Sequence, residues 1–368
     1  MKRYRFRYKA TTHPVFRIGL PVFLVSAAVL LLCLVSVPVA DFVNGTVSTA
    51  LRFVFAKAFD PFSFSAGEFL LILTVALLFG ILLYLIFFCR SRYRARKTVS
   101  FVLGVALIVL SLCTFTLSVP YHTTELDEKL GFDTAGATSA ELEETAKVMI
   151  GELNSLVGGI EFDGNGSSVM PYSLDEMSEK ICQAYRTANE TYDLCLNYET
   201  RIKPVTFSRA MSYLRLIGIY TFYTGESNLN VDYPDYNYPA TAAHEFAHQR
   251  GIIRENEANF VAFLVCLSSE DDYIRYSGYL STLIYVLNAL YEASSSKYYA
   301  TVSLLDERIR GEIHAEAVQS EQYQGTVVAE ISEKANDTYL KVQGLPEGEK
   351  SYGLVVDLTV AYYRAQKE

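Results

Sequence analysis

Three long apolar runs near the N-terminus constrain what this chain can fold into more than any other feature. Residues 18–39, 69–89 and 101–119 are almost entirely apolar, and about 20 such residues in a helix cross the hydrocarbon core of a bilayer. A cleaved signal peptide would have a shorter apolar core followed by a small-residue cleavage site. Because two further runs follow the first, the sequence predicts three uncleaved transmembrane helices in a lipid bilayer.

The positions of the basic residues predict how these helices are oriented. Residues 1–120 contain 13 Lys and Arg against 3 Asp and Glu, and the basic residues concentrate before the first run and between the second and third. Cytoplasmic loops carry such an excess. We therefore expect a multi-pass cell-membrane protein with a cytoplasmic N-terminus and an extracytoplasmic C-terminal domain. Residues 41–65, which contain several aromatics, are expected to form a loop at the membrane interface.

The composition changes after Pro120. Beyond this point no apolar run reaches the length of about 18 residues that a spanning helix needs, and 38 acidic residues stand against 19 basic ones. We therefore divide the chain into a membrane anchor, residues 1–120, and one extracytoplasmic domain, residues 121–368. The negative charge of this second part argues against nucleic acid and against anionic lipid as its partners.

Apolar periodicity predicts an α+β fold of mainly α type for the second part. Apolar stripes at helical spacing, some of them preceded by capping residues, predict helices at residues 138–157, 173–192, 259–267, 271–294, 303–316, 319–336 and 350–366. Residues rich in β-branched and aromatic side chains predict a small sheet from residues 204–207, 218–223 and 227–231. We expect Leu229 to Val231 to be an edge strand to which substrate backbone adds.

The sequence HEFAH at residues 244–248 carries the predicted chemistry. Two His four positions apart lie on one face of a helix, about one turn apart, so His244 and His248 can bind one metal ion together. Glu245 points to the open side of that ion, where a water would sit. Such a pattern arises by accident in about 1 % of chains of this length, but two of only 5 His stand at this spacing here. We therefore predict a Zn²⁺ site.

The segment RENEAN, which follows Gly251, offers two candidates for a third ligand. If a helix begins at Glu255, then Glu255 and Asn259 share a face, and Glu257 is rotated away by about 200°. We favour Glu255 and keep Glu257 as the alternative. The order of residues resembles the ExxAD pattern of glutamate-liganded zincins, which implies that Asn259 hydrogen-bonds a ligand His. Arg254 stands where the metzincins have a third His, which excludes that group.

Two further features leave alternatives open. A second donor to the developing oxyanion is usual in such sites; the candidates are Tyr276, Tyr279, Tyr352 and Arg275, and their spacing does not choose among them. For each of them a packing role is the stronger expectation. The 6 Cys imply no disulfide framework. A bond between Cys182 and Cys195 is open in an oxidising compartment, but it would leave the third Cys of this part unpaired.

Longer stretches resemble a bacterial family. They include PVTFSRAMSYLRLIGIYTFYTGESNLNV, HEFAHQRG, RENEANFVAFLVC and RYSGYLSTLIYVLNALY, and the central pattern is HExxHQxGxxxExEAN. Proteins similar to this chain are membrane-anchored, are catalogued as a domain of unknown function and are regarded as zinc metallopeptidases. The resemblance covers most of the chain. It implies a zincin-like fold with a glutamate as third ligand, and it implies no substrate.

The sequence thus predicts a membrane-anchored zinc metallopeptidase acting on a peptide or protein of the cell envelope. Glu245 would take a proton from the attacking water and pass it to the leaving amine. The alternatives are a zinc-binding sensor or signalling protein, a scaffold whose HExxH helix is only structural, and a zinc hydrolase acting on a non-peptide amide. Intramembrane proteolysis is not expected, because the HExxH helix lies far from the spans in sequence and has polar flanks.

Overall fold

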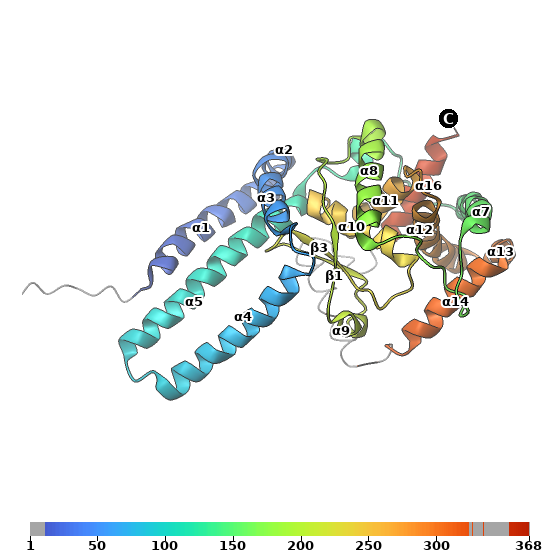
Figure 1. Ribbon diagram of the computed structural model, residues 1–368. Helices are drawn as coiled ribbons and strands as arrows, with labels where there is room; N and C mark the ends of the chain where they lie inside the picture. The colour runs from blue at the N-terminus through green and yellow to red at the C-terminus, as the bar shows by residue number, and fades with distance from the viewer. Residues whose placement is uncertain (1–11, 324–325, 327–333, 335–352, 368) are drawn as a thin grey trace, which may run out of the picture.

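The computed structural model describes residues 12–323, 326, 334 and 353–367. An arm of long helices leads into a mainly helical body, and a small sheet lies where the two meet (Figure 1). The predicted mainly helical architecture with a small sheet is therefore confirmed.

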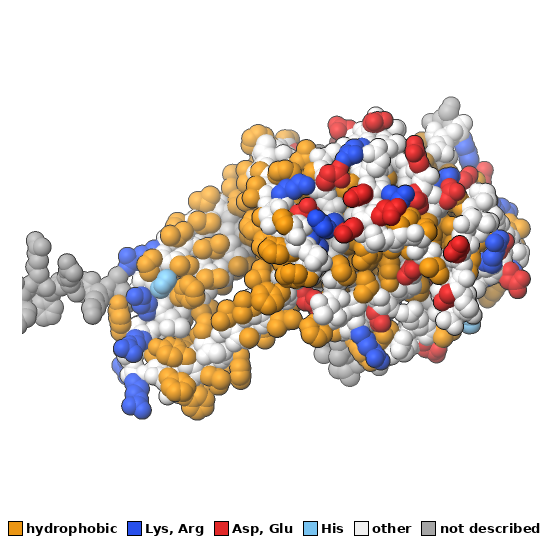
Figure 2. Space-filling model, viewed as in Figure 1, with side chains coloured by type: hydrophobic (Ala, Val, Ile, Leu, Met, Phe, Trp, Pro, Cys, Tyr) orange, Lys and Arg blue, Asp and Glu red, His pale blue; other side chains and the backbone are white. Residues whose placement is uncertain are grey.

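Three helices of the arm are long and apolar enough to cross a membrane. They are α1 (Pro14–Val35), α4 (Ala66–Leu83) with its continuation to Phe88, and α5 (Arg92–Cys113) with its continuation to His122. Helix α1 packs along α5, whereas α4 stands apart from this pair (Figure 1). The arm is apolar on its surface, and Lys and Arg gather at its free tip (Figure 2). The predicted apolar helices are thus present; the bounds of the first two are shifted by a few residues, and the third begins at Arg92 instead of residue 101.

The connection between α1 and α4 is helical, so the predicted loop at residues 41–65 is wrong. It contains α2 (Val37–Val43), a π-helical turn (Asn44–Ser48) and α3 (Thr49–Phe59). Arg52 in α3 is fully buried. Its Nη2 donates to Asn44 Oδ1 at 2.7 Å and its Nη1 donates to the Thr116 carbonyl at 3.5 Å. The prediction failed because this helix is stabilised by burial against the body, which its mixed sequence does not reveal.

Three short strands form one sheet in the order β1-β3-β2. They are β1 (Ile202–Pro204), β2 (Gly218–Thr221) and β3 (Glu226–Leu229). Strand β1 is parallel to β3, and β2 is antiparallel to it. Because β3 is paired on both sides, the prediction of an edge strand at Leu229 to Val231 is wrong. The strand at the edge beside the candidate site is β2, and nothing in the alternation of a short strand distinguishes an edge from a centre.

The helices of the body surround a buried pair, α10 (Asn237–Arg250) and α11 (Glu255–Leu267). The others are α6 (Leu126–Leu130), α7 (Ser139–Leu156), α8 (Leu174–Tyr192), α9 (Ser208–Tyr213), α12 (Asp272–Ala293), α13 (Ser295–Val302), α14 (Glu307–Glu321) and α16 (Gly353–Ala365). Thr138 caps α7 in a capping box and Ser173 caps α8, which confirms both predicted starts. Most of the helix predicted at 319–336 lies outside the described residues.

Helix α10 lies between the sheet and the other helices, so its position is fixed from several sides. It contacts β2 and β3 on one side and α11 and α12 on another, and α3 of the arm also lies against it. Phe246 in α10 and Phe260 in α11 are fully buried. The HExxH segment therefore stands on one of the most constrained helices of the molecule, as a site that needs fixed geometry requires.

Candidate metal centre

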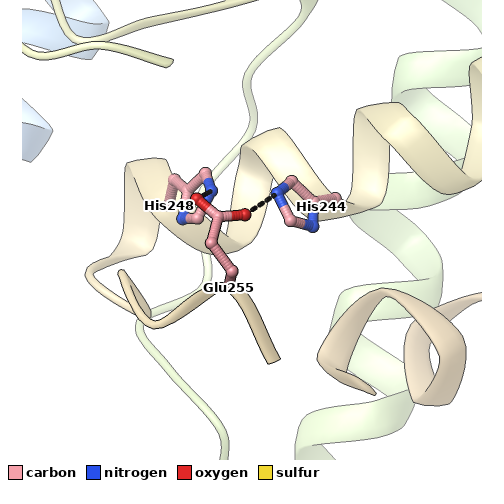
Figure 3. A group of neighbouring side chains, drawn as sticks. All are labelled: His244, His248 and Glu255. Carbon is pink, nitrogen blue, oxygen red and sulfur yellow. Dashed lines mark ion pairs between the residues drawn. The ribbon is translucent and has the colours of Figure 1, made fainter. Parts of the chain in front are cut away.

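Helices α10 and α11 bring three potential metal ligands together (Figure 3). His244 and His248 lie one turn apart on α10, with their ring centroids 4.4 Å apart. The helix ends at Gly251, whose φ of +103° is in the left-handed region that favours glycine. The chain then turns back into α11, whose first residue is Glu255. Glu255 Oε2 lies 3.3 Å from His244 Nε2, and Oε1 lies 3.5 Å from His248 Nε2.

These separations suit one tetrahedral metal ion. Ligand atoms about 2.1 Å from a zinc ion at tetrahedral angles lie about 3.4 Å from one another, and the two separations, each to a different oxygen of Glu255, are 3.3 and 3.5 Å. One ligand atom from each of the three side chains lies within 4.8 Å of the others. Within the described part of the chain, this is the single group of three or more His, Cys, Asp or Glu with such a spacing.

Glu257, the alternative third ligand, points elsewhere. Its Oε1 accepts hydrogen bonds from Arg254 Nη1 at 2.8 Å and from the Leu126 backbone N–H at 2.9 Å, and the side chain is buried. Glu255, the favoured candidate, is therefore the glutamate that lies beside the two His. Glu257 instead holds Arg254 in place at the start of α11.

Charge coupling within the group is strong. Burial lowers the pKa of His248, but the neighbouring Glu255 carboxylate outweighs this effect and raises the pKa to about 9. Burial raises the pKa of Glu255, but the two His outweigh it and hold this pKa well below its usual range. His248 Nδ1 lies 2.8 Å from the Ile252 carbonyl oxygen, which orients the ring so that Nε2 faces Glu255.

Glu245 occupies a tight, buried position beside the two His. Burial raises its pKa, while His244 and His248 act in the opposite direction. Its Oε2 is buried without a hydrogen-bond partner. Strand β2 passes so close that a Cβ atom on Gly218 would lie 2.5 Å from Glu245 Oε1. A carboxyl group with a raised pKa next to a potential metal site has the properties of a general base that must also hold a proton.

The predicted hydrogen bond from Asn259 to a ligand His is not formed. Asn259 Nδ2 and His244 Nδ1 are both buried without hydrogen-bond partners, and His248 Nδ1 is oriented by the Ile252 carbonyl instead. The Asn259 side chain lines a cavity next to Glu255. The prediction failed because a backbone carbonyl in the turn after α10 orients His248, and the sequence pattern does not reveal that carbonyl.

The candidate oxyanion donors lie away from the group. The Tyr276 hydroxyl donates to the Glu312 carboxylate in the core, Tyr279 packs on Phe263, and Arg275 forms an ion pair with Glu152 at 3.4 Å. The structural roles that the sequence favoured for these three residues are therefore the ones found, and none of the three side chains lines the cavity. Tyr352 lies outside the described residues.

The cavity next to the group has a volume of about 1420 Å³. Strand β2, helices α10 and α12 and the end of the third apolar helix line it, and His244, Glu245, His248 and Glu255 all face it. Sequence reasoning missed the contribution of α12. Its face toward the cavity carries small and polar residues at helical spacing, a pattern visible in the sequence, namely Gly278, Ser281, Thr282, Tyr285, Asn288 and Glu292.

Fold and site together define a mainly helical protein with membrane-length apolar helices and a His/His/Glu group at a large cavity. The chain belongs to the family described as Protein of unknown function (DUF3810), which matches residues 42–360. The expectation of a family of unknown function is thereby confirmed. No curated protein and no solved structure matches the chain.

Proposed function

We propose that this protein is a membrane-anchored, zincin-like zinc metallopeptidase that hydrolyses peptide bonds. The observation that carries this proposal is the His/His/Glu group beside a separate, buried Glu245 at the wall of a large cavity. Structural zinc sites are closed by four protein ligands, whereas catalytic sites use three and leave one position open. A third ligand from a second helix and a glutamate next to the first His agree with the catalytic kind.

His244 Nε2, His248 Nε2 and the Glu255 carboxylate would hold the ion. When bound, zinc activates water and polarises a carbonyl group. Glu245 accepts the proton that the attacking water gives up and delivers it to the leaving amine. Burial, which raises the pKa of Glu245, stabilises the protonated form between these two events. Gly218 lies in close contact with the carboxyl group and bounds it on the side of β2.

Residues around the group provide the remaining functions. Tyr285 lines the cavity, and burial together with the charges of Glu255 and Glu316 raises its pKa to about 12. It therefore remains a neutral hydroxyl that can donate to a carbonyl oxygen in the transition state. Among the described strands β2 has no neighbour on its outer edge, and this edge offers backbone groups to an extended peptide. We therefore assign the role of oxyanion donor to Tyr285 instead of Tyr276 or Tyr279.

The arm anchors the enzyme in the membrane. We propose that α1, α4 and α5 with their continuations cross the cell membrane, since each is long and apolar enough. Lys and Arg at the free tip of the arm (Figure 2) favour a cytoplasmic location of that tip, and the body then lies outside. Peptides or proteins of the cell envelope would be the substrates.

A zinc-binding sensor is the second candidate function. Helix α3 of the arm lies directly on α10, and a Cβ atom on Gly251 would collide with the Arg52 guanidinium. A structural change at the metal site would therefore displace residues of the arm. In this case the protein would bind zinc and transmit its presence without cleaving any peptide.

Metal content and peptidase activity of the full-length protein test both candidates. We expect about one zinc per chain, lost in His244→Ala and Glu255→Ala and retained in Glu245→Gln, because Glu245 is not a ligand. Peptidase activity against a peptide library should fall by about 10²-fold or more in Glu245→Gln. Full activity of Glu245→Gln would contradict the mechanism. Zinc without peptidase activity in the wild type would favour the sensor, and a well-folded protein without zinc would exclude both.

A further inference from the structure

The cavity reaches the end of the third apolar helix. Leu117 and Tyr121, both in its continuation beyond α5, line the cavity together with the metal-site residues. The basic residues of this helix end at Lys97. About 20 residues cross the hydrocarbon core of a bilayer, and counting from Thr98 brings the opposite boundary to Leu117. With this helix crossing the bilayer as proposed above, one wall of the cavity lies at the surface of the hydrocarbon core.

The third metal ligand is fixed to the same helix end. Arg254 directly precedes Glu255 and is buried. Its Nη2 donates to the carbonyl oxygens of Tyr121 at 2.8 Å and Thr123 at 2.7 Å, while its Nη1 pairs with Glu257. Because these bonds join the start of α11 to the end of the third apolar helix, the position of Glu255 relative to that helix end is fixed.

Strand β2 ties the catalytic base to α4 in the same way. Its first residue, Gly218, is in close contact with Glu245, and its last residue, Thr221, is in close contact with Gly67 in the first turn of α4. Glu226 of β3 accepts hydrogen bonds from the backbone N–H groups of Ala66 at 3.2 Å and Gly67 at 2.7 Å. A strand advances about 3.3 Å per residue, so Gly218 beside the base and Thr221 beside the first turn of α4 lie about 10 Å apart along β2.

The surface between the site and the arm carries several exposed apolar side chains beside the exposed Arg215. Ile219 and Leu214 line the cavity and are 40 % and 37 % exposed. Phe207, which is 59 % exposed, donates its backbone N–H to Glu68 in the first turn of α4. Phe62 and Phe64, just before α4, are exposed as well. Apolar and aromatic side chains at this level suit the interface of a bilayer better than open water.

We infer that the site acts on a substrate tethered in the same bilayer, at a peptide bond close to the point where the chain leaves the membrane. The inference rests on the proposed function and on α4 and the third apolar helix crossing the bilayer. An extended chain covers about 3.3–3.6 Å per residue, so a gap of about 10 Å corresponds to about three residues. Hydrolysis adds one water across the C–N bond, with OH to the carbonyl carbon and the proton to the amine.

The test uses the full-length protein in liposomes with two matched reporter libraries. In the first, a randomised ten-residue segment follows a single apolar helix of about 20 residues on the side of the body. In the second, the same segment is free in solution. Glu245→Gln gives the background. We expect cleavage of the tethered form at least tenfold faster, with cuts within about six residues of the helix.

A rigid spacer separates this effect from the higher local concentration that tethering alone produces. A helical spacer of about ten residues between the apolar helix and the cleaved segment raises the segment by about 15 Å and leaves its surface concentration unchanged. We expect the rate to fall at least fivefold. An unchanged rate with the spacer, or equal cleavage of the free segment, overturns the inference and leaves the peptidase proposal intact. Cleavage of neither library by the wild type overturns both.

Discussion

At the scale of residues, the position of Glu245 depends on the absence of a side chain at Gly218. A Cβ atom there would lie 2.5 Å from Glu245 Oε1 and 2.7 Å from Thr241 Cγ2, so both side chains would have to shift to make room for it. We expect Gly218→Ala to displace the Glu245 carboxyl. Because a misplacement of about 1 Å can cost about 10² in rate, peptidase activity should fall by this order while zinc content stays near that of the wild type.

The matched control is Gly151→Ala on the exposed side of α7, where an added Cβ meets nothing within 4 Å. This variant should keep its activity and gain a little helix stability. Activity is measured on the same peptide pool, and zinc by elemental analysis. Wild-type activity in Gly218→Ala would show that the contact does not position the base.

The site residues that could be predicted from the sequence are those that lie close to one another along the chain. His244, Glu245 and His248 lie within about one helical turn, so helix geometry alone predicts their relative positions. Glu255 was predicted from the face that it occupies on the next helix. Tyr285 shows the other case, because it reaches the cavity only through the packing of α12 against α10 and α11.

At the scale of elements, the close approach of α11 and α12 depends on Gly278. A Cβ atom at this position would collide with Cys266 Cβ, deep inside van der Waals contact, and both helices are buried there. We expect Gly278→Ala to force the helices apart and to lower the free energy of unfolding by about 1–3 kcal/mol. Thermal unfolding of the detergent-solubilised protein measures this change.

A second substitution identifies the atom responsible. Cys266→Ala keeps the Cβ atom and should not rescue Gly278→Ala, whereas Cys266→Gly removes it and should restore part of the lost stability. Rescue by Cys266→Ala would assign the clash to the sulfur instead of the Cβ atom.

Elements with their own caps and stripes could be predicted, and elements stabilised by distant partners could not. Thr138 and Ser173 begin α7 and α8 where local capping places them. Helix α3 depends on the burial of Arg52, and the central place of β3 depends on its pairing with β1. The Thr116 carbonyl that accepts from Arg52 and the strand that pairs with β3 are both distant in sequence, so the sequence pattern of each element was ambiguous.

At the scale of the whole molecule, metal binding and folding are coupled through protons. Without metal, Glu255 raises the pKa of His248 to about 9, above its ordinary value of about 6.5. The His248–Glu255 interaction therefore stabilises the metal-free fold fully below about pH 6.5, and this contribution is lost as the pH rises through about 9. Zinc requires a neutral imidazole, so zinc affinity should rise over the same range.

These opposite dependences make one prediction about the stability of the complete protein. The chelated protein should lose thermal stability between pH 6.5 and 9, whereas saturating zinc should raise the stability most at the upper end of this range. An excess of free zinc of about 100 times the dissociation constant adds about 2.7 kcal/mol. Melting temperatures with zinc and with chelator, measured at matched pH, give the difference directly.

His244→Ala serves as the control and should show no zinc-dependent shift, because a site with one His removed cannot retain the ion. A zinc effect that is independent of pH would mean that the ion binds elsewhere, since only a site containing His248 must release this proton.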